Sequence, residues 1–127
     1  MTRLLLVDDH DAFRHTATRA FQRAKFEVLP FASGTEALSV LAREQVDLVV
    51  TDVFMPDLDG IELLQKLRDV APDVPVVVVT GGWKSFTPQL MSTMMRQLGV
   101  AESVHKPVTG AALVDVVQRV LSSTTEA

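Results

Sequence analysis

Short apolar runs alternate with amphipathic stretches along the chain. Runs of four to six residues, several of them rich in β-branched side chains, predict five strands, at Leu4–Val7, Phe26–Phe31, Val46–Thr51, Val74–Val79 and Glu102–His105. Between these runs, apolar residues recur every three or four positions, which predicts helices at Phe13–Ala24, after Ser33, after Asp59, after Pro88 and at Leu113–Leu121. Ser33 and Glu36 have the spacing of a capping box at the start of the second helix.

This alternation of strand and helix predicts an α/β fold in which helices cover both faces of a parallel sheet. Five right-handed units of this kind most often form a flavodoxin-like, doubly wound sheet with strand order 2-1-3-4-5 and five helices. We therefore expect one domain over residues 1–122 and a flexible tail over residues 123–127. In this order the first and third strands are neighbours, and ligands bind at their carboxyl ends.

The composition narrows the class of protein. The 127 residues carry 12 basic and 16 acidic side chains, a formal net charge of -4, whereas proteins that coat nucleic acids have a strong basic excess. The absence of cysteine from the sequence excludes disulfides and thiolate metal sites. The apolar runs are too short to span a bilayer, and the amino terminus lacks the pattern of a signal peptide. We expect a soluble cytoplasmic domain that binds neither a membrane nor nucleic acid directly.

Acidic residues gather where two of the predicted strands end. Asp8 and Asp9 follow the first strand and Asp52 follows the third, so the predicted strand order brings the three carboxylates together. At about 4 Å and an effective dielectric near 20, each such pair costs roughly 4 kcal/mol of repulsion. A divalent cation offsets that cost, and oxygen ligands favour Mg²⁺, with Mn²⁺ as an alternative.

Two more polar residues follow strands at the same edge of the sheet. Thr80 comes after the fourth strand and Lys106 after the fifth, which places a hydroxyl and an ammonium near the acidic cluster. Phosphoryl transfer needs such groups to neutralise the phosphoryl oxygens, and an aspartate nucleophile forms an acyl phosphate. The set of side chains therefore predicts phosphoryl-transfer chemistry.

Over essentially its whole length, the chain resembles the receiver domain of bacterial two-component response regulators. The stretches that carry the resemblance are Leu5–Asp9, Asp52–Gly60, Thr80 and Lys106–Pro107. The resemblance implies that Asp52 is the phosphoacceptor, that Thr80 hydrogen-bonds a phosphoryl oxygen, and that Lys106 pairs with the phosphoryl group or Asp52. It also implies a cis peptide bond between Lys106 and Pro107.

The same resemblance implies a metal site and a set of partners. Asp8, Asp9, Asp52 and the backbone carbonyl of Phe54 would bind Mg²⁺. A sensor histidine kinase or a phosphotransfer protein would supply the phosphoryl group, and a separate effector protein or a C-terminal output domain would receive the signal. Phosphorylation would control protein contacts, including a homodimer. The domain would be a regulatory phosphoacceptor that catalyses its own phosphorylation and dephosphorylation, with no separate substrate.

Three other functions are compatible with parts of the pattern. The first is a phosphorylation-independent interaction module on the same fold. The second is an aspartate-nucleophile phosphatase or dehalogenase, although many such phosphatases carry a second acid where this chain has Phe54. The third is an FMN-binding electron carrier, whose phosphate the acidic residues Asp8–Asp11 would repel.

Several positions depart from the family pattern. Ser103 stands where the family usually has an aromatic switch residue, so a coupled rotation of Thr80 and an aromatic ring is not expected. Gly81 and Gly82 follow Thr80, and Trp83 then covers the core edge, contacts a partner or lies over the site. The methionines of the fourth helix either pack in the core or form an adaptable binding surface; they are Met91, Met94 and Met95.

We expect supporting roles for other residues near the candidate site. Phe54, two residues after Asp52, would shield an acyl phosphate from water and slow its hydrolysis. Asp57 and Asp59 are expected to shape the loop, and Asp11 to stabilise the first turn of the first helix. We expect His10 to be a solvated neighbour of the acidic cluster, because Mg²⁺ prefers oxygen ligands.

Overall fold

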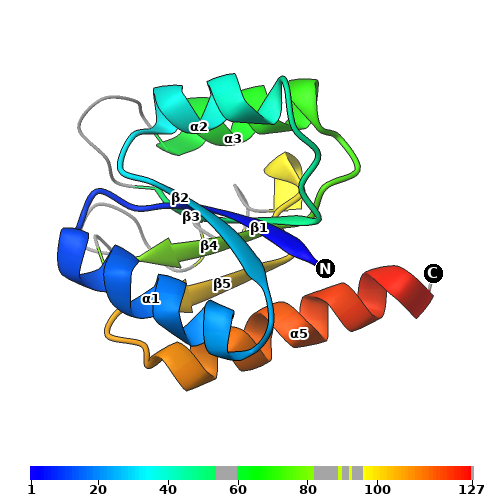
Figure 1. Cartoon of the computed structure of the whole chain (residues 1–127). Helices are drawn as coiled ribbons and strands as arrows, with labels where there is room; N and C mark the ends of the chain where they lie inside the picture. The colour runs from blue at the N-terminus through cyan, green and yellow to red at the C-terminus, as the bar shows by residue number, and fades with distance from the viewer. Residues whose placement is uncertain (54–59, 82–88, 90–91, 93–95, 127) are drawn as a thin grey trace.

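A five-stranded parallel sheet forms the centre of the molecule (Figure 1). The computed structural model describes residues 1–53, 60–81, 89, 92 and 96–126. The strands are β1 (Arg3–Val7), β2 (Glu27–Phe31), β3 (Leu48–Asp52), β4 (Val76–Thr80) and β5 (Glu102–His105). They lie in the order β2-β1-β3-β4-β5, and every neighbouring pair is parallel. The predicted flavodoxin-like strand order is therefore confirmed.

Helices cover both faces of the sheet, as the alternating pattern predicts (Figure 1). The helix α1 (Asp11–Arg23) and the helix α5 (Gly110–Glu126) pack on one face, and α2 (Gly34–Leu41) and α3 (Gly60–Val70) pack on the other. Residues 96–98 form a helical turn before β5. Much of the helix predicted after Pro88 lies outside the described residues.

Alternate residues of β1 show how the sequence fills the two cores. Leu4 and Leu6 pack in the cluster beneath α1 and α5, whereas Leu5 and Val7 pack in the cluster beneath α2 and α3. All four side chains are at most 1% exposed. A strand buried on both faces has no polar face, which explains its continuous apolar run. The first polar residue after such a run therefore marks the sheet edge.

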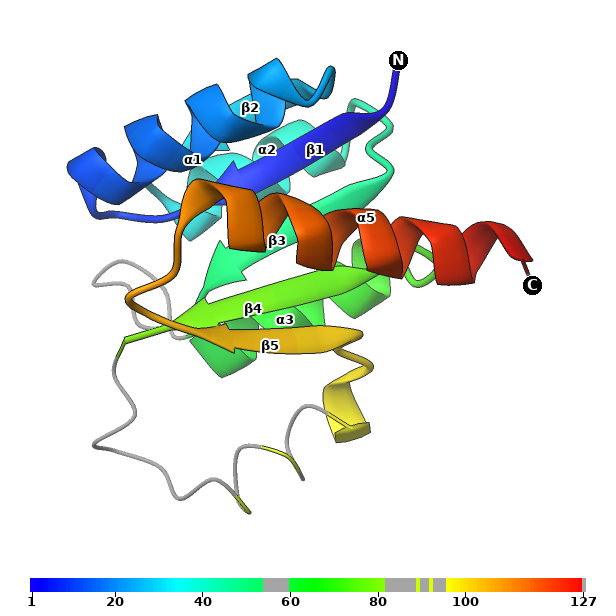
Figure 2. The same ribbon diagram turned by 90° about the horizontal axis from the view of Figure 1, so that it is seen from below.

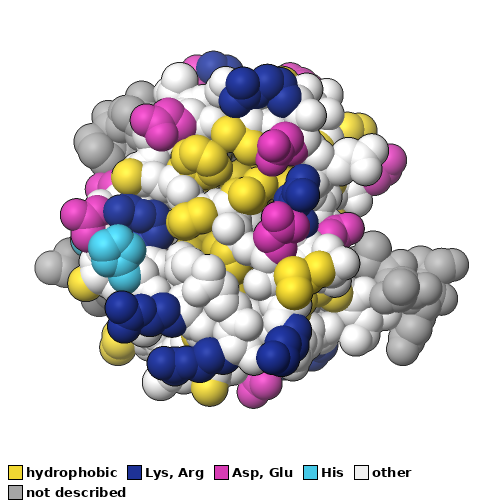
Figure 3. Space-filling model, in the orientation of Figure 1, with side chains coloured by type: hydrophobic (Ala, Val, Ile, Leu, Met, Phe, Trp, Pro, Cys, Tyr) yellow, Lys and Arg dark blue, Asp and Glu magenta, His cyan; other side chains and the backbone are white. Residues whose placement is uncertain are grey.

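All five strands are parallel and point toward the same edge of the sheet, where the arrowheads of β1, β3, β4 and β5 lie in Figure 2. The turn from β1 into α1 and the turn from β5 toward α5 also lie at this edge (Figure 2). Basic side chains gather over α1 on the face shown in Figure 3, beside this edge. This edge holds the polar residues that the sequence singles out.

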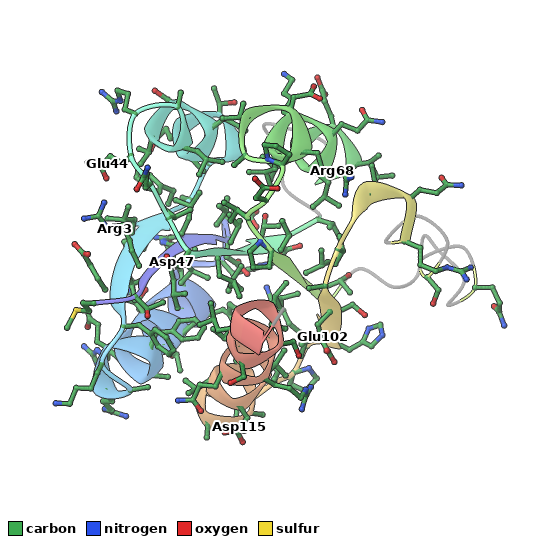
Figure 4. All side chains as sticks on the ribbon, turned by 90° about the vertical axis from the view of Figure 1, so that its right-hand side faces the viewer. Arg3, Glu44, Asp47, Arg68, Glu102 and Asp115 are labelled. Carbon is green, nitrogen blue, oxygen red and sulfur yellow. The ribbon has the colours of Figure 1, made fainter. Side chains whose placement is uncertain are left out.

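An exposed ion-pair network marks the opposite edge of the sheet (Figure 4). Arg3 Nε lies 2.9 Å from Glu27 Oε2, and the Arg3 backbone N–H donates to Asp47 Oδ2 at 2.8 Å. The hydrogen bond to Glu27 raises the pKa of Arg3. Because exposed pairs contribute at most about 1 kcal/mol each, this network adds little to the stability of the fold.

The last helix is longer than its apolar pattern in the sequence. It continues to Glu126, into the range 123–127, and the flexibility of that range stays a prediction. Residues 122–126 contain neither glycine nor proline, so nothing in their chemistry stops the helix once it has formed. The helix therefore extends beyond the last apolar residue of its sequence pattern. Among the described residues, no helix has the length and apolar character needed to cross a membrane.

The start of α2 offers a stability test. Ser33 Oγ accepts a hydrogen bond from the Glu36 backbone N–H at 3.3 Å, which confirms the serine half of the predicted capping box. We expect Ser33→Ala to lower the free energy of unfolding by about 1 kcal/mol, because that N–H loses its partner. Urea unfolding measures the difference, and Ser39→Ala, at an exposed position within α2, is the matched control. Equal losses in the two variants would contradict the capping role.

Candidate functional site

The candidate site lies where the strands end. Asp52 is the last residue of β3 and Thr80 the last of β4, and these strands are neighbours. Asp8 directly follows β1 on the other side of β3, and Lys106 directly follows β5. The parallel sheet therefore brings together four residues that lie up to 98 positions apart in the sequence.

Three aspartates and one histidine form a compact cluster at this edge. One ligand atom from each of Asp8, Asp9, His10 and Asp52 lies within 4.8 Å of the others. The side chain of Asp8 is 1% exposed and that of Asp52 is 2% exposed. The expectation that the two acidic stretches meet is thus confirmed, and burial keeps water from screening their charges.

Lys106 supplies the positive charge that faces these aspartates. Its ammonium Nζ lies 2.8 Å from Asp8 Oδ2 and 3.1 Å from Asp52 Oδ2. The same atom stands 4.4 Å from the centre of the Phe13 ring, a cation–π contact. Burial acts to lower the pKa of Lys106, but its hydrogen bonds to Asp8 and Asp52 act in the other direction and raise the pKa overall. Lys106 is therefore charged at neutral pH and fixed between two carboxylates.

Because the pKa of Lys106 is raised, part of the folding stability is lost at alkaline pH. A lysine with a raised folded-state pKa stabilises the fold fully below its ordinary value of 10.5, and that contribution disappears as the pH rises through the folded-state value. We expect the difference in unfolding free energy between the native chain and Lys106→Met to be constant below that value and to shrink above it. Urea unfolding between about pH 8 and about pH 11.5 measures it. A constant difference over the whole range would contradict the prediction; Lys66→Met, an exposed lysine, is the control.

The loop between β1 and α1 is held by hydrogen bonds to its own backbone. The His10 backbone N–H donates to Asp8 Oδ1 at 2.8 Å. Arg14, one turn into α1, donates from Nη1 to the Asp8 carbonyl oxygen at 2.8 Å and from Nη2 to Asp11 Oδ1 at 2.7 Å. The hydrogen bond from Arg14 lowers the pKa of Asp11. The sequence pattern does not single out Arg14. The sign of its role in the sequence is its three-residue spacing from Asp11, which suits an ion pair on a helix.

His10 lies closer to the cluster than the sequence suggests. Its side chain is 66% exposed, in keeping with a solvated neighbour. Yet its ring nitrogen Nδ1 is 3.3 Å from Lys106 Nζ and 3.3 Å from Asp8 Oδ1. The ring therefore forms part of the rim of the site.

The carboxylates suit a hard divalent cation. Asp9 Oδ1 is a buried atom without a hydrogen-bond partner in the part of the chain that the structure describes. Such an atom costs free energy unless a ligand satisfies it, and carboxylate oxygens are the ligands that Mg²⁺ prefers. Asp8, Asp9 and Asp52 together therefore form a cluster that could bind a metal ion.

The remaining predicted residues divide into those the structure describes and those it does not. Thr80 is fully buried at the end of β4, and the Lys106–Pro107 peptide bond is cis. Ser103 is half-buried on β5, paired with Val78 of β4. The predictions for the other residues lie outside the described part of the chain; they concern Phe54, Asp57, Asp59, Gly82, Trp83, Met91, Met94 and Met95.

The sheet order and the position of the acidic pocket define a doubly wound α/β protein with its site at the switch point between β1 and β3. The chain belongs to the response regulator receiver domain family, whose sequence profile matches residues 4–118. It is a module of two-component signalling. The resemblance to receiver domains that the sequence shows is therefore confirmed.

Several bacterial proteins contain a segment with a similar sequence. The chain is 35% identical over 81 residues to the response regulator receiver protein CpdR of Brucella abortus, covering 64% of this chain and 68% of that protein. It is 44% identical over 80 residues to the sensor kinase CckA of the same organism, covering 61% of this chain and 8% of CckA. It is 33% identical over 116 residues to the C4-dicarboxylate transport regulator DctD of Rhizobium meliloti, covering 91% of this chain and 24% of DctD. The chain thus spans only a small part of CckA and DctD.

Solved structures agree on the fold. A CheY-like receiver domain protein from Methanospirillum hungatei matches 99% of this chain and 98% of its own, with a TM-score of 0.90 and 25% identity. The chemotaxis protein CheY4 of Vibrio cholerae matches 94% of this chain and 98% of its own, with a TM-score of 0.85 and 27% identity.

Proposed function

We propose that this receiver domain accepts a phosphoryl group on Asp52 from a phosphohistidine and thereby switches its contacts with other proteins. The observation that carries the proposal is the position of Lys106, whose ammonium lies 3.1 Å from Asp52 and 2.8 Å from Asp8 in a buried acidic cluster. A buried carboxylate facing a fixed cation is suited to attack a phosphoryl group whose charge that cation can neutralise.

The transfer exchanges one bond for another. An oxygen of the Asp52 carboxylate forms a bond to phosphorus while the P–N bond of the phosphohistidine breaks, and the imidazole keeps that electron pair and takes up a proton. Lys106 and the hydroxyl of Thr80 would stabilise the charge on the phosphoryl oxygens. The product is an acyl phosphate on Asp52.

A divalent cation completes the proposed site. Asp8, Asp9 and Asp52, with the backbone carbonyl of Phe54, would hold Mg²⁺ or Mn²⁺. The cation, when bound, supplies positive charge to the phosphoryl oxygens during transfer. Asp9 Oδ1, a buried oxygen without a hydrogen-bond partner among the described residues, would gain a partner in that cation.

The partners follow from the chemistry of the donor and from the named relatives. The donor would be a sensor histidine kinase or a phosphotransfer protein, and the relative CckA is itself named a sensor kinase. DctD is a transcriptional regulatory protein of which this domain matches 24%, so an output domain or a separate effector would receive the signal. The receiver would be a regulatory phosphoacceptor, which catalyses its own phosphorylation and dephosphorylation, and phosphorylation would control dimerisation.

One position favours a second function. Ser103 is a half-buried serine on β5, whereas the resemblance implies an aromatic switch residue there. A domain without that residue could act as an interaction module independent of phosphorylation. The same experiment separates the two functions.

The deciding experiment incubates the native chain with Mg²⁺ and a small phosphodonor such as acetyl phosphate, and follows intact mass. We expect a single phosphoryl adduct that forms with Mg²⁺ and does not form with EDTA. An autophosphorylated histidine kinase labelled on its phosphoryl group should transfer the label to the chain. No adduct under conditions that label another receiver domain would refute the proposed function and support the interaction module.

A further inference from the structure

A ring nitrogen stands among the oxygen atoms of the acidic cluster. His10 Nδ1 lies 3.3 Å from Asp8 Oδ1, 3.6 Å from Asp9 Oδ1 and 3.9 Å from Asp52 Oδ2. One ligand atom from each of Asp8, Asp9, His10 and Asp52 lies within 4.8 Å of the others. The cluster is therefore a mixed set of one nitrogen and three oxygen donors.

These spacings match those between ligands of a single metal ion. With metal–ligand distances of about 2.0–2.2 Å, neighbouring ligands of one ion lie about 3.0–3.6 Å apart and opposite ligands about 4.2 Å apart. Two of the three distances from His10 Nδ1, 3.3 Å and 3.6 Å, fall within the range for neighbouring ligands, and the third, 3.9 Å, lies between the two classes. One ion can thus contact His10 and the carboxylates without a large movement of the backbone.

Two further observations mark these donors as a cation site. Asp9 Oδ1, 3.6 Å from His10 Nδ1, is buried and has no hydrogen-bond partner among the described residues. Lys106 Nζ, a cation, already lies within 3.3 Å of His10 Nδ1 and 2.8 Å of Asp8 Oδ2. The donors therefore attract positive charge, and an incoming ion competes with the ammonium for them.

The nitrogen changes which ions the site selects. Mg²⁺ binds oxygen and makes little use of an imidazole, whereas Ni²⁺, Co²⁺ and Zn²⁺ bind imidazole well and have higher intrinsic affinities for mixed donors. We propose that His10 Nδ1 is a ligand of the cluster for these late divalent ions, so that His10, together with Asp8, Asp9 and Asp52, raises the affinity for them and not that for Mg²⁺. This inference rests on the metal-binding part of the proposed function and is independent of phosphoryl transfer.

Calorimetric titration of the untagged native chain tests the selectivity, with Ni²⁺, Zn²⁺ and Mg²⁺ as separate probes and no phosphodonor. We expect His10→Ala to weaken Ni²⁺ and Zn²⁺ binding by about tenfold or more and to change Mg²⁺ binding by less than about twofold. His15→Ala, which removes an exposed histidine of α1 outside the cluster, should change none of the three affinities. Equal weakening of Ni²⁺ and Mg²⁺ by His10→Ala, or no weakening of either, would overturn the inference.

A spectroscopic readout identifies the ligand atom. In ¹H–¹⁵N spectra of the imidazole groups, diamagnetic Zn²⁺ should shift the Nδ1 resonance of His10 and leave both nitrogens of His15 unchanged. A shift confined to Nε2, or the same Nδ1 shift in Asp9→Asn, would place the ion elsewhere and contradict the inference. The metal titrations contain no phosphoryl donor, so their outcome does not depend on phosphoryl transfer. If the chain binds Zn²⁺ through His10 in these titrations but forms no adduct in the separate phosphodonor experiment, only the proposed function is refuted.

Discussion

Replacing Asp52 with asparagine is expected to abolish phosphorylation of the chain. An amide lacks the nucleophilic carboxylate oxygen that forms the bond to phosphorus, so the rate of adduct formation should fall by about 10³-fold or more. The side chain is 2% exposed, and Lys106 Nζ lies 3.1 Å from it, so the variant keeps the facing cation but loses the carboxylate proposed as the nucleophile. Intact mass after incubation with Mg²⁺ and acetyl phosphate measures the loss.

The control for this variant must remove one negative charge without touching the site. Asp115→Asn does so, because Asp115 is exposed on α5 and is not part of the acidic cluster. It should form the adduct at the native rate. Asparagine nearly matches the size of aspartate, so circular dichroism and thermal melting should show both variants folded. An adduct on Asp52→Asn at the native rate would mean that another residue accepts the phosphoryl group.

The carboxyl ends of the buried strands could be predicted, because the sequence changes there from apolar to polar residues. A parallel strand buried on both faces has a continuous apolar run, and its first polar residue marks the sheet edge. That rule places Asp8, after Leu4–Val7, and Thr80, after Val76–Val79, correctly. It fails at the beginnings of strands: the apolar pattern predicts a strand from Val46, but β3 begins at Leu48. Val46 is nevertheless buried, at 7% exposure, because an apolar run reports burial and not strand pairing.

The loop between β1 and α1 could not be predicted in the same way. Periodicity gives the direction of side chains in regular elements, but His10 has extended backbone angles, φ -82° and ψ 107°, just before α1. Its ring direction depends on those angles and on the bond from its N–H to Asp8. The contact of Arg14 with the Asp8 carbonyl joins a strand end to a helix turn, for which no sequence spacing rule exists. The site's rim is therefore known only from the structure.

Magnesium is expected to stabilise the native chain, and Asp9→Asn should remove that effect. An ion that binds the folded state at a concentration of 100 times its dissociation constant adds about 2.7 kcal/mol to the free energy of unfolding. Asp9 Oδ1 is buried without a hydrogen-bond partner among the described residues, and Asp9 belongs to the cluster with Asp8 and Asp52. Without metal, the three carboxylates repel each other, so Asp9→Asn should itself raise the unfolding free energy by about 0.5–2 kcal/mol.

Urea unfolding in EDTA and in excess Mg²⁺ measures both effects on the same variants. Because one substitution stabilises the metal-free chain and destroys the response to metal, the two changes have opposite signs relative to the native chain. A general loss of packing would lower stability under both conditions and cannot produce this pattern. Asp73→Asn, at an exposed position outside the cluster, should respond to Mg²⁺ as the native chain does. If Asp9→Asn were less stable than the native chain in EDTA, the carboxylate of Asp9 would have a stabilising partner, and the argument for a strained acidic pocket would fail.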